Sequence, residues 1–365
     1  MKREASHVFN QHPIRAIMAV LLVGITMIFT ACSSDDAATP TDQSYSGPGS
    51  KWDVTLKVDG TFAIDKYTDA ADTTVDFGFT GTYTRLTTGF KKLTVGAVTG
   101  TGGPSVGDVA YGLEVPGFVF ALKPAGGGDQ VIPMVASGTC PSTDINANWV
   151  KVNMRDGLSD FVNTDTAGKF NYNATTGAAT LPDRYKVGGG SLGSNTVGTG
   201  TCANGVMTIG NVEMYLTSNG GAAVNTDNSN SASAEFLFAF GQSAISDINS
   251  LDGTYAGLMI DESKSAGSHI EPIKIVCSAG TCTGQGYTDI ETGAVINGGV
   301  SITLNSADSP ATGFVTATVT EGSVTSPLIC MFDKNAVGSG KTIGSCAGEG
   351  AGGSRAMFNV LFVSI

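Results

Sequence analysis

The sequence has little charge, and basic residues are in the minority. Only 14% of its 365 residues are charged, and 20 Lys and Arg stand against 32 Asp and Glu, for a net charge of −12. Such a chain is repelled by nucleic acid and by anionic lipid surfaces, so we expect no nucleic-acid partner. The acidic residues are spread along the chain, which indicates a solvated surface rather than a cation site.

Histidine and metal-binding patterns are also scarce. His269 is the only histidine after residue 31, so any Ser-His-Asp triad would depend on it, and its polar surroundings favour an exposed loop instead. The cysteines form neither a Cys-x-x-Cys pair nor a cluster with histidine, which argues against a thiolate metal site. Asp227-Asn228-Ser229-Asn230 offers alternating oxygen ligands but lacks the Gly and the distal Glu of a calcium loop. The sequence therefore predicts no metal, no cofactor and no enzyme activity.

Two glycine-rich segments imitate well-known catalytic or nucleotide-binding motifs. Gly189-Gly190-Ser191-Leu192-Gly193 fits the Gly-x-Ser-x-Gly elbow of hydrolases, but that elbow requires a following helix, and the sequence favours a loop there. Gly338-Ser339-Gly340-Lys341-Thr342 is similar to the end of a phosphate-binding loop, although Asn335 stands where the first Gly is required. Since no helix is expected after it either, we predict a hairpin loop at this position.

Strong helix formers are sparse, whereas glycine, threonine, valine and serine are abundant. The chain contains 50 Gly, each of which destabilises a helix interior by about 1 kcal/mol relative to Ala, while β-branched residues suit strands. Period-two alternation begins at Trp52, Val54 and Leu56 and continues after the turn signal Asp59-Gly60. Similar segments recur at the spacing of a barrel or sandwich. We therefore predict an all-β fold with two antiparallel β-barrel or β-sandwich domains, or three if the first divides.

A polar segment and a short linker set the expected domain boundaries. Residues 32–50 are rich in Ser, Asp, Ala, Thr, Pro and Gly, which predicts a flexible tether. A linker expected at Ile245–Leu251 separates an N-terminal β domain at 51–245 from a C-terminal β domain at 251–365. A division near residue 157 would split the first of these domains in two.

Five aromatic side chains share one face of neighbouring predicted strands: Trp52, Phe62, Phe77, Phe79 and Tyr83. They fit two interpretations, because a barrel of about eight strands is either filled by its own side chains or holds one small ligand. Of the two, we favour a filled core over the lining of an apolar ligand cavity.

Six cysteines follow Cys32, and an even number in an oxidising compartment indicates disulfides, although six allow many pairings. Proximity in the sequence favours Cys277 with Cys282 across a hairpin loop, and Cys330 with Cys346 across a glycine-rich loop. Cys140 and Cys202 would then remain to pair with each other.

The N-terminus combines a basic leader with an apolar run. Lys2, Arg3 and Arg15 precede or flank residues 16–29, a run that carries no charge. As a helix this run would reach about 21 Å, which is short for a membrane span and suits the core of a signal peptide. Residues 1–31 are therefore expected to be a signal peptide.

The apolar run ends in Phe29-Thr30-Ala31-Cys32, which resembles the lipobox of bacterial lipoprotein precursors, although Phe29 stands where Leu is usual. The resemblance implies cleavage before Cys32, a diacylglyceryl thioether on its sulfur and acylation of the new amine. Several acyl chains would hold the protein stably on a membrane. Because Ser33 rather than Asp follows the cysteine, the resemblance also implies the outer membrane, with the protein at the periplasmic face or the cell surface. The alternative is an ordinary signal peptide, with Cys32 free or paired.

These observations lead to one expected function and two alternatives. We expect a lipid-anchored lipoprotein of the outer membrane or cell surface that acts as a non-enzymatic binding, adhesion or structural module. Its partners would be the membrane, through lipid on Cys32, and an unknown protein, glycan or small apolar ligand. Its polar loops at 188–200 and 219–233 would contact such a partner. The alternatives are a calycin-like barrel that carries a small apolar ligand and a secreted-type hydrolase that uses Ser191 or an acid pair.

Overall fold

The computed structural model describes residues 41–365, apart from 48–51, 69–73, 127–130, 137–139, 153–165, 188, 204, 210–211, 218–221, 225–235, 242, 262–269 and 350–356. Residues 42–365 form one compact unit. The described part consists of strands and short 3-10 helices, which confirms the predicted all-β fold. Within these residues, no helix has the length and apolar character needed to cross a membrane. Cys32 and the expected signal peptide lie outside the described residues.

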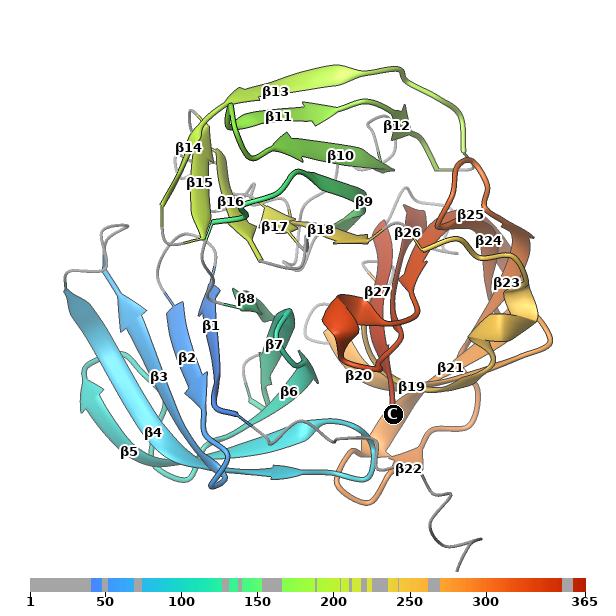
Figure 1. The fold of residues 1–365 in the computed structure, drawn as a ribbon. Coiled ribbons are helices and arrows are strands. Elements are labelled where there is room, and N and C mark those ends of the chain that lie inside the picture. The colour runs from blue at the N-terminus through green and yellow to red at the C-terminus, as the bar shows by residue number, and fades with distance from the viewer. Residues whose placement is uncertain are drawn as a thin grey trace, which may run out of the picture. The chain divides into compact units, whose positions relative to one another are not determined.

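The first eight strands close into an antiparallel barrel in sequence order, which we call the N-terminal barrel (blue to teal in Figure 1). They are β1 (Gln43–Gly47), β2 (Trp52–Leu56), β3 (Thr61–Tyr67), β4 (Val75–Arg85), β5 (Lys91–Gly100), β6 (Val109–Val115), β7 (Val119–Pro124) and β8 (Ile132–Ala136). The pairing of Tyr45 with Ala136 joins β1 to β8 and closes the ring. The alternation that begins at Trp52 places Val54 and Leu56 in the interior, as period-two patterning requires.

The next strands form a ten-stranded sheet, which we call the middle sheet (green to yellow in Figure 1). They are β9 (Ile145–Val152), β10 (Ala167–Asn173), β11 (Ala178–Leu181), β12 (Arg184–Tyr185), β13 (Asn195–Thr199), β14 (Thr201–Ala203), β15 (Val206–Ile209), β16 (Val212–Leu216), β17 (Ala222–Val224) and β18 (Phe236–Gly241). In its centre β9 pairs with β10 and β18. Trp149, Phe170 and Tyr172 lie in the core of this sheet.

The last strands form a second closed barrel, which we call the C-terminal barrel (orange to red in Figure 1). They are β19 (Gly253–Asp261), β20 (Ile270–Ser278), β21 (Thr281–Asp289), β22 (Ala294–Val295), β23 (Val300–Ala307), β24 (Phe314–Glu321), β25 (Val324–Asp333), β26 (Ile343–Glu349) and β27 (Met357–Ser364). Eight of these strands close the ring, because β20 pairs with β21 as well as with β19, while β22 is attached to β21.

Three expected boundaries differ from the structure. Strand β1 lies inside the segment expected to be a tether, and its Tyr45 is fully buried at 0% exposure. The first division falls between β8 and β9 rather than near residue 157, which is outside the described residues. The expected linker is packed rather than free, since Ile245 and Leu251 are buried in the core of the C-terminal barrel, with η2 (Ile248–Leu251) between them. The errors at the tether and at the linker came from polar composition, which does not show how a segment packs or pairs with strands.

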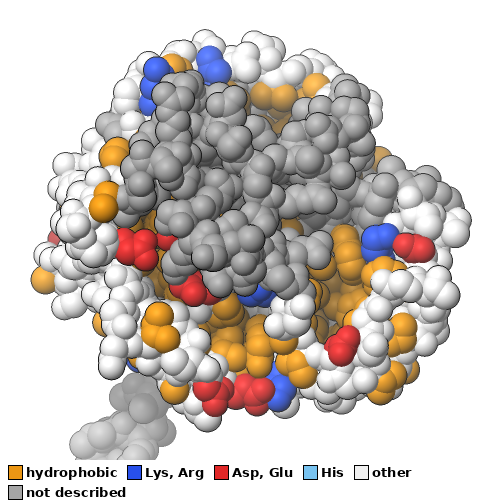
Figure 2. All heavy atoms as spheres, turned by 180° about the vertical axis from the view of Figure 1, so that it is seen from behind, with side chains coloured by type: hydrophobic (Ala, Val, Ile, Leu, Met, Phe, Trp, Pro, Cys, Tyr) orange, Lys and Arg blue, Asp and Glu red, His pale blue; other side chains and the backbone are white. Residues whose placement is uncertain are grey.

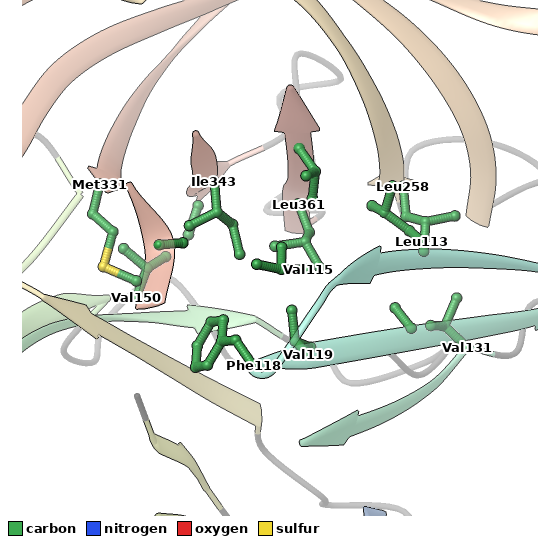
Figure 3. Close-up of a cluster of buried hydrophobic side chains, with 14 of the residues drawn as sticks. Leu113, Val115, Phe118, Val119, Val131, Val150, Leu258, Met331, Ile343 and Leu361 are labelled. Carbon is green, nitrogen blue, oxygen red and sulfur yellow. The ribbon is translucent and has the colours of Figure 1, made fainter. Parts of the chain in front are cut away.

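A shared apolar core connects the outer faces of the three sheets. Figure 3 shows its members from the N-terminal barrel, the middle sheet and the C-terminal barrel, namely Leu113, Val115, Phe118, Val119, Val131, Val150, Leu258, Met331, Ile343 and Leu361. Polar contacts reinforce it, because Asn148 Nδ2 donates to the carbonyl of Thr312 at 2.7 Å and Lys92 Nζ lies 2.6 Å from Glu291 Oε1. The burial of outer faces as well as interiors explains why the sheets form one compact unit.

The described residues contain three disulfides, and these join the pairs that sequence proximity favours. Cys277–Cys282 links directly opposed residues of β20 and β21, and Cys330–Cys346 links opposed residues of β25 and β26. Both lie in the core of the C-terminal barrel. Cys140 lies in the connection that precedes β9, and its disulfide with Cys202 links this connection to strand β14 of the middle sheet. The described disulfides therefore reinforce the second and third sheets and leave the N-terminal barrel without one.

Candidate ligand-binding cavity in the N-terminal barrel

The N-terminal barrel contains a cavity of about 810 Å³. Its wall is largely apolar and includes Trp52, Phe62, Phe77, Phe79, Leu93, Val95, Ala110, Leu122 and Ile132. The volume falls within the range of about 300–1,000 Å³ that is typical of small-molecule sites. Figure 2 shows hydrophobic side chains at the bottom of a hollow on the side of this barrel (lower right), with charged side chains near its edge.

The cavity occupies one half of the barrel. Most lining residues lie at the starts of β2, β4, β6 and β8, at the ends of β3 and β7, or in the β5–β6 connection at 101–108, while Phe62, Leu93 and Val95 extend the cavity deeper into the barrel. The other half is filled, because Tyr45, Leu56 and Phe120 are buried in the same core but do not line the cavity. The barrel therefore has a hollow end, which we call the mouth, and a packed end, which we call the base.

Four of the five aromatic side chains identified from the sequence line this cavity. Trp52 and Phe77 meet edge to face with centroids 5.8 Å apart, and Phe62 and Phe79 do so at 6.1 Å. Phe77 also stacks on Phe79 at 6.2 Å. All four rings come from β2, β3 and β4, so they cover one wall rather than meeting across the barrel. Phe62, Phe77 and Phe79 also belong to the buried core cluster of the barrel, against which Trp52 and Tyr83 pack, so these rings are part of the core as well as the cavity wall.

The β5–β6 connection lies against the mouth. A Cβ atom added at Gly103 would lie 2.7 Å from Cδ2 of Phe77, so this loop approaches the ring as closely as backbone can. Gly102 beside it has a φ of +82°, a conformation that residues with side chains rarely adopt. Glycine at these positions lets the connection cover part of the aromatic wall, and larger residues would hold it away.

The mouth also carries charge. Lys66 Nζ lies 2.9 Å from Asp76 Oδ2 and 5.5 Å from the centroid of Phe77, so its ammonium is both paired and placed over an aromatic face. Asp108 lines the cavity at the end of the β5–β6 connection, and its Oδ2 accepts a hydrogen bond from the backbone N–H of Ser105 at 2.7 Å. Lys66 and Asp108 are the charged residues in the described wall of the cavity.

A buried polar network closes the base. Lys91 Nζ lies 3.0 Å from Glu114 Oε2, and their side chains are only 9% and 5% exposed. Tyr45 donates a hydrogen bond to Glu114 Oε1 at 2.7 Å, and Lys91 lies 4.3 Å from the ring centroid of Tyr83. Burial, together with the negative charge of Glu114, raises the pKa of Tyr45 well above its usual value. The network satisfies the charges that would otherwise be stranded inside the barrel.

The other motifs identified in the sequence are not brought to this cavity. Ser191 is exposed, its Oγ accepts from Gly193 N at 3.2 Å, and strand β13 rather than a helix follows it. Residues 338–342 lie in the connection of residues 334–342 between the paired strands β25 and β26, as expected for a hairpin loop, and this connection also contains η3 (Ala336–Gly338). His269 and Asp227–Asn230 lie outside the described residues. Lys66, Lys91 and Glu114 were missed because single charges in alternating strands look like solvent-exposed positions, and Asp108 was missed because a charge in a connection is ordinary.

Comparison with known proteins gives a distant likeness in structure alone. No family model and no curated protein match the chain. Crystal structures of isotype 1 transferrin binding protein B from serogroup B Neisseria meningitidis and of a double mutant of the vaccine antigen transferrin binding protein B from Haemophilus parasuis Hp5 are similar to it. The first is 10% identical with a TM-score of 0.27 over 86% of this chain and 65% of its own, and the second is 8% identical with a TM-score of 0.26 over 87% and 66%. The chain thus spans less than two thirds of either protein, and a likeness at these TM-scores does not determine its function.

Proposed function

We propose that this chain is a lipid-anchored, non-enzymatic binding module whose N-terminal barrel takes up a small apolar ligand through its mouth. The observation that carries the proposal is the cavity of about 810 Å³ with an aromatic and aliphatic wall. Water in such a cavity finds few hydrogen-bond partners, whereas an apolar ligand gains about 25 cal/mol for each Å² of its surface removed from water. The buried Lys91–Glu114 pair favours entry from the mouth, because it fills the base.

The binding proposal is tested with the full purified chain and the uncharged fluorescent hydrophobe N-phenyl-1-naphthylamine. Ala110 faces the cavity, so Ala110→Phe should fill part of it and weaken binding at least about tenfold, which corresponds to about 1.4 kcal/mol. Ala97 is exposed on the neighbouring strand β5 and does not line the cavity, so Ala97→Phe adds the same ring outside the barrel. Equal binding by both variants, or no saturable binding by the unaltered chain, would refute the proposal.

The anchoring part of the proposal rests on Phe29-Thr30-Ala31-Cys32 and on the absence of charge in residues 16–29. Lipid on Cys32 would place the barrels outside the cytosol, where the three disulfides of the described residues are stable. Labelled palmitate should enter the protein and be lost in Cys32→Ala, which should leave a soluble product. Persistent labelling in Cys32→Ala would contradict the anchor without affecting the cavity.

Location at the outer membrane or cell surface is a separate part of the proposal. It is supported by Ser33, because the lipobox resemblance implies inner-membrane retention only when Asp follows the cysteine. Protease treatment of intact cells should degrade the protein if it is displayed at the surface and spare it at the periplasmic face. Recovery in the inner-membrane fraction would contradict both locations.

A further inference from the structure

The mouth of the N-terminal barrel carries a positive charge that is already neutralised. Lys66 is the lysine in the described wall of the cavity, and its Nζ lies 2.9 Å from Asp76 Oδ2. The same ammonium lies 5.5 Å from the centroid of Phe77, which holds it at the rim. An anionic group at the mouth would have to compete with Asp76 for Lys66, so this lysine does not offer a free site for a carboxylate or phosphate.

A negative charge at the same rim is not neutralised. Asp108 lines the cavity, and its carboxylate accepts one backbone hydrogen bond, from Ser105 at 2.7 Å. Among the described residues it has no ion-pair partner. Among the described residues, the charges of Lys66, Asp76 and Asp108 sum to about −1 at the mouth, on a chain that is itself acidic.

From this arrangement we infer that the cavity selects hydrophobes without a negative charge, and that Asp108 is the specificity-determining residue. The inference rests on the proposed function and names its ligand class, an apolar body whose head group carries no negative charge. Repulsion by Asp108 opposes an anionic head at the mouth, and the apolar wall opposes its transfer to the interior. At the partly solvated rim, one carboxylate should change the affinity for an anion by about fivefold to tenfold.

The test compares 1-dodecanol with dodecanoate, which have similar chains and differ in charge at neutral pH, as competitors of N-phenyl-1-naphthylamine on the full chain. An alcohol enters any apolar site more readily than a carboxylate, so a preference of the unaltered chain for dodecanol does not by itself implicate Asp108. The decisive measurement is the change in each affinity when Asp108 is substituted. Asp108→Asn should raise the affinity for dodecanoate about fivefold and leave the affinity for dodecanol unchanged. Its amide oxygen can still accept the hydrogen bond from Ser105, so the loop should keep its conformation. Lys66→Gln should lower the affinity for dodecanoate below that of the unaltered chain, because it leaves Asp76 unpaired.

Asp59→Asn provides the matched control. It removes the same charge from the β2–β3 turn at the base end, where Asp59 Oδ1 accepts from the backbone N–H of Thr61 at 2.9 Å, and it should change neither affinity. Tighter binding of dodecanoate than of dodecanol by the unaltered chain would overturn the inference. An unchanged dodecanoate affinity in Asp108→Asn, or an equal gain in Asp59→Asn, would also overturn it. If neither competitor displaces the probe, the proposed function itself fails.

Discussion

The two barrels of this chain have the same number of strands but different interiors. The N-terminal barrel is packed at its base and hollow at its mouth. The C-terminal barrel has a larger buried cluster, which includes two disulfides and the preceding residues Ile245 and Leu251. Eight strands can either be filled by side chains or hold a ligand, and the strand number alone does not decide between them.

The side chains that lie opposite the aromatic rings explain the difference. In the C-terminal barrel, Phe362 meets both Tyr255 at 5.3 Å and Phe332 at 5.5 Å, and these rings come from β27, β19 and β25. Strand β27 is adjacent to β19 and is separated from β25 only by β26, so these three rings also lie on one wall of their barrel, where Phe332 and Phe362 meet beside Gly344. In the N-terminal barrel, the rings of the mouth come from the adjacent strands β2, β3 and β4 and leave the opposite wall to smaller residues such as Ala110. Rings on one wall thus occur in both barrels, and the C-terminal barrel is filled because the opposite strand β23 carries the larger residues Ile302 and Leu304.

The largest expected effect comes from removing the central ring of the filled barrel. Phe362→Ala should destabilise the C-terminal barrel by about 4 kcal/mol, because the ring is 2% exposed and its loss leaves a cavity among close-packed neighbours. Phe79→Ala removes the same atoms from the cavity wall of the N-terminal barrel and should cost about half as much, since one side of that ring has no packing partner. Hydrogen exchange resolved by mass spectrometry reports each barrel separately. Equal losses would contradict a hollow N-terminal barrel.

The next effect concerns the base of the N-terminal barrel. Lys91→Met should destabilise this barrel by about 3 kcal/mol, because it leaves the carboxylate of Glu114 buried without a counter-charge. The double variant Lys91→Met with Glu114→Gln should recover most of the loss, since the amide oxygen still accepts from Tyr45 and no charge remains buried. Denaturant midpoints of the three proteins measure the coupling. No recovery in the double variant would show that Lys91 acts through packing rather than charge.

Local pattern predicted much of this fold, while pairing between distant segments did not follow from it. The alternation at Trp52, Val54 and Leu56 correctly predicted a strand and the side chains that face the barrel interior. The short loop between Cys277 and Cys282 indicated a disulfide between neighbouring strands. Strand β1 was missed because only Tyr45 and Gly47 are buried in it, and its place depends on pairing with β8 across most of the barrel sequence.

The cavity was equally hidden from local reasoning. The sequence placed Phe62, Phe77 and Phe79 on one face, but whether such rings meet or line a space depends on which strands lie opposite, and that is set by ring closure. Lys91 and Glu114 form the buried pair across β5 and β6, yet each looks like an ordinary solvent-facing charge in its own strand. Chemistry-bearing residues in this protein were therefore harder to predict than its architecture.

A smaller effect on stability is expected at alkaline pH, at the base of the N-terminal barrel. Burial, followed by the charge of Glu114, raises the pKa of Tyr45, so between about pH 10 and its folded pKa the unfolded chain releases a proton that the folded chain keeps. Stability from this group is complete below about pH 10 and is lost as the pH rises. Tyr45→Phe should reduce the alkaline loss of protection in the N-terminal barrel. Phenolate absorbance and hydrogen exchange measure it, and an unchanged profile would assign the transition to other groups.

The smallest effect on stability should come from the mouth. Lys66→Gln breaks an ion pair whose side chains are 29% and 40% exposed, and such pairs contribute about 0–1 kcal/mol. The unfolding midpoint should therefore change little, in contrast to Lys91→Met at the base, although both substitutions remove one lysine from one carboxylate in the same barrel. The same variant should still weaken the binding of dodecanoate. A large loss of stability in Lys66→Gln would mean that the mouth supports the barrel structurally, and its charges could then not be assigned to ligand selection.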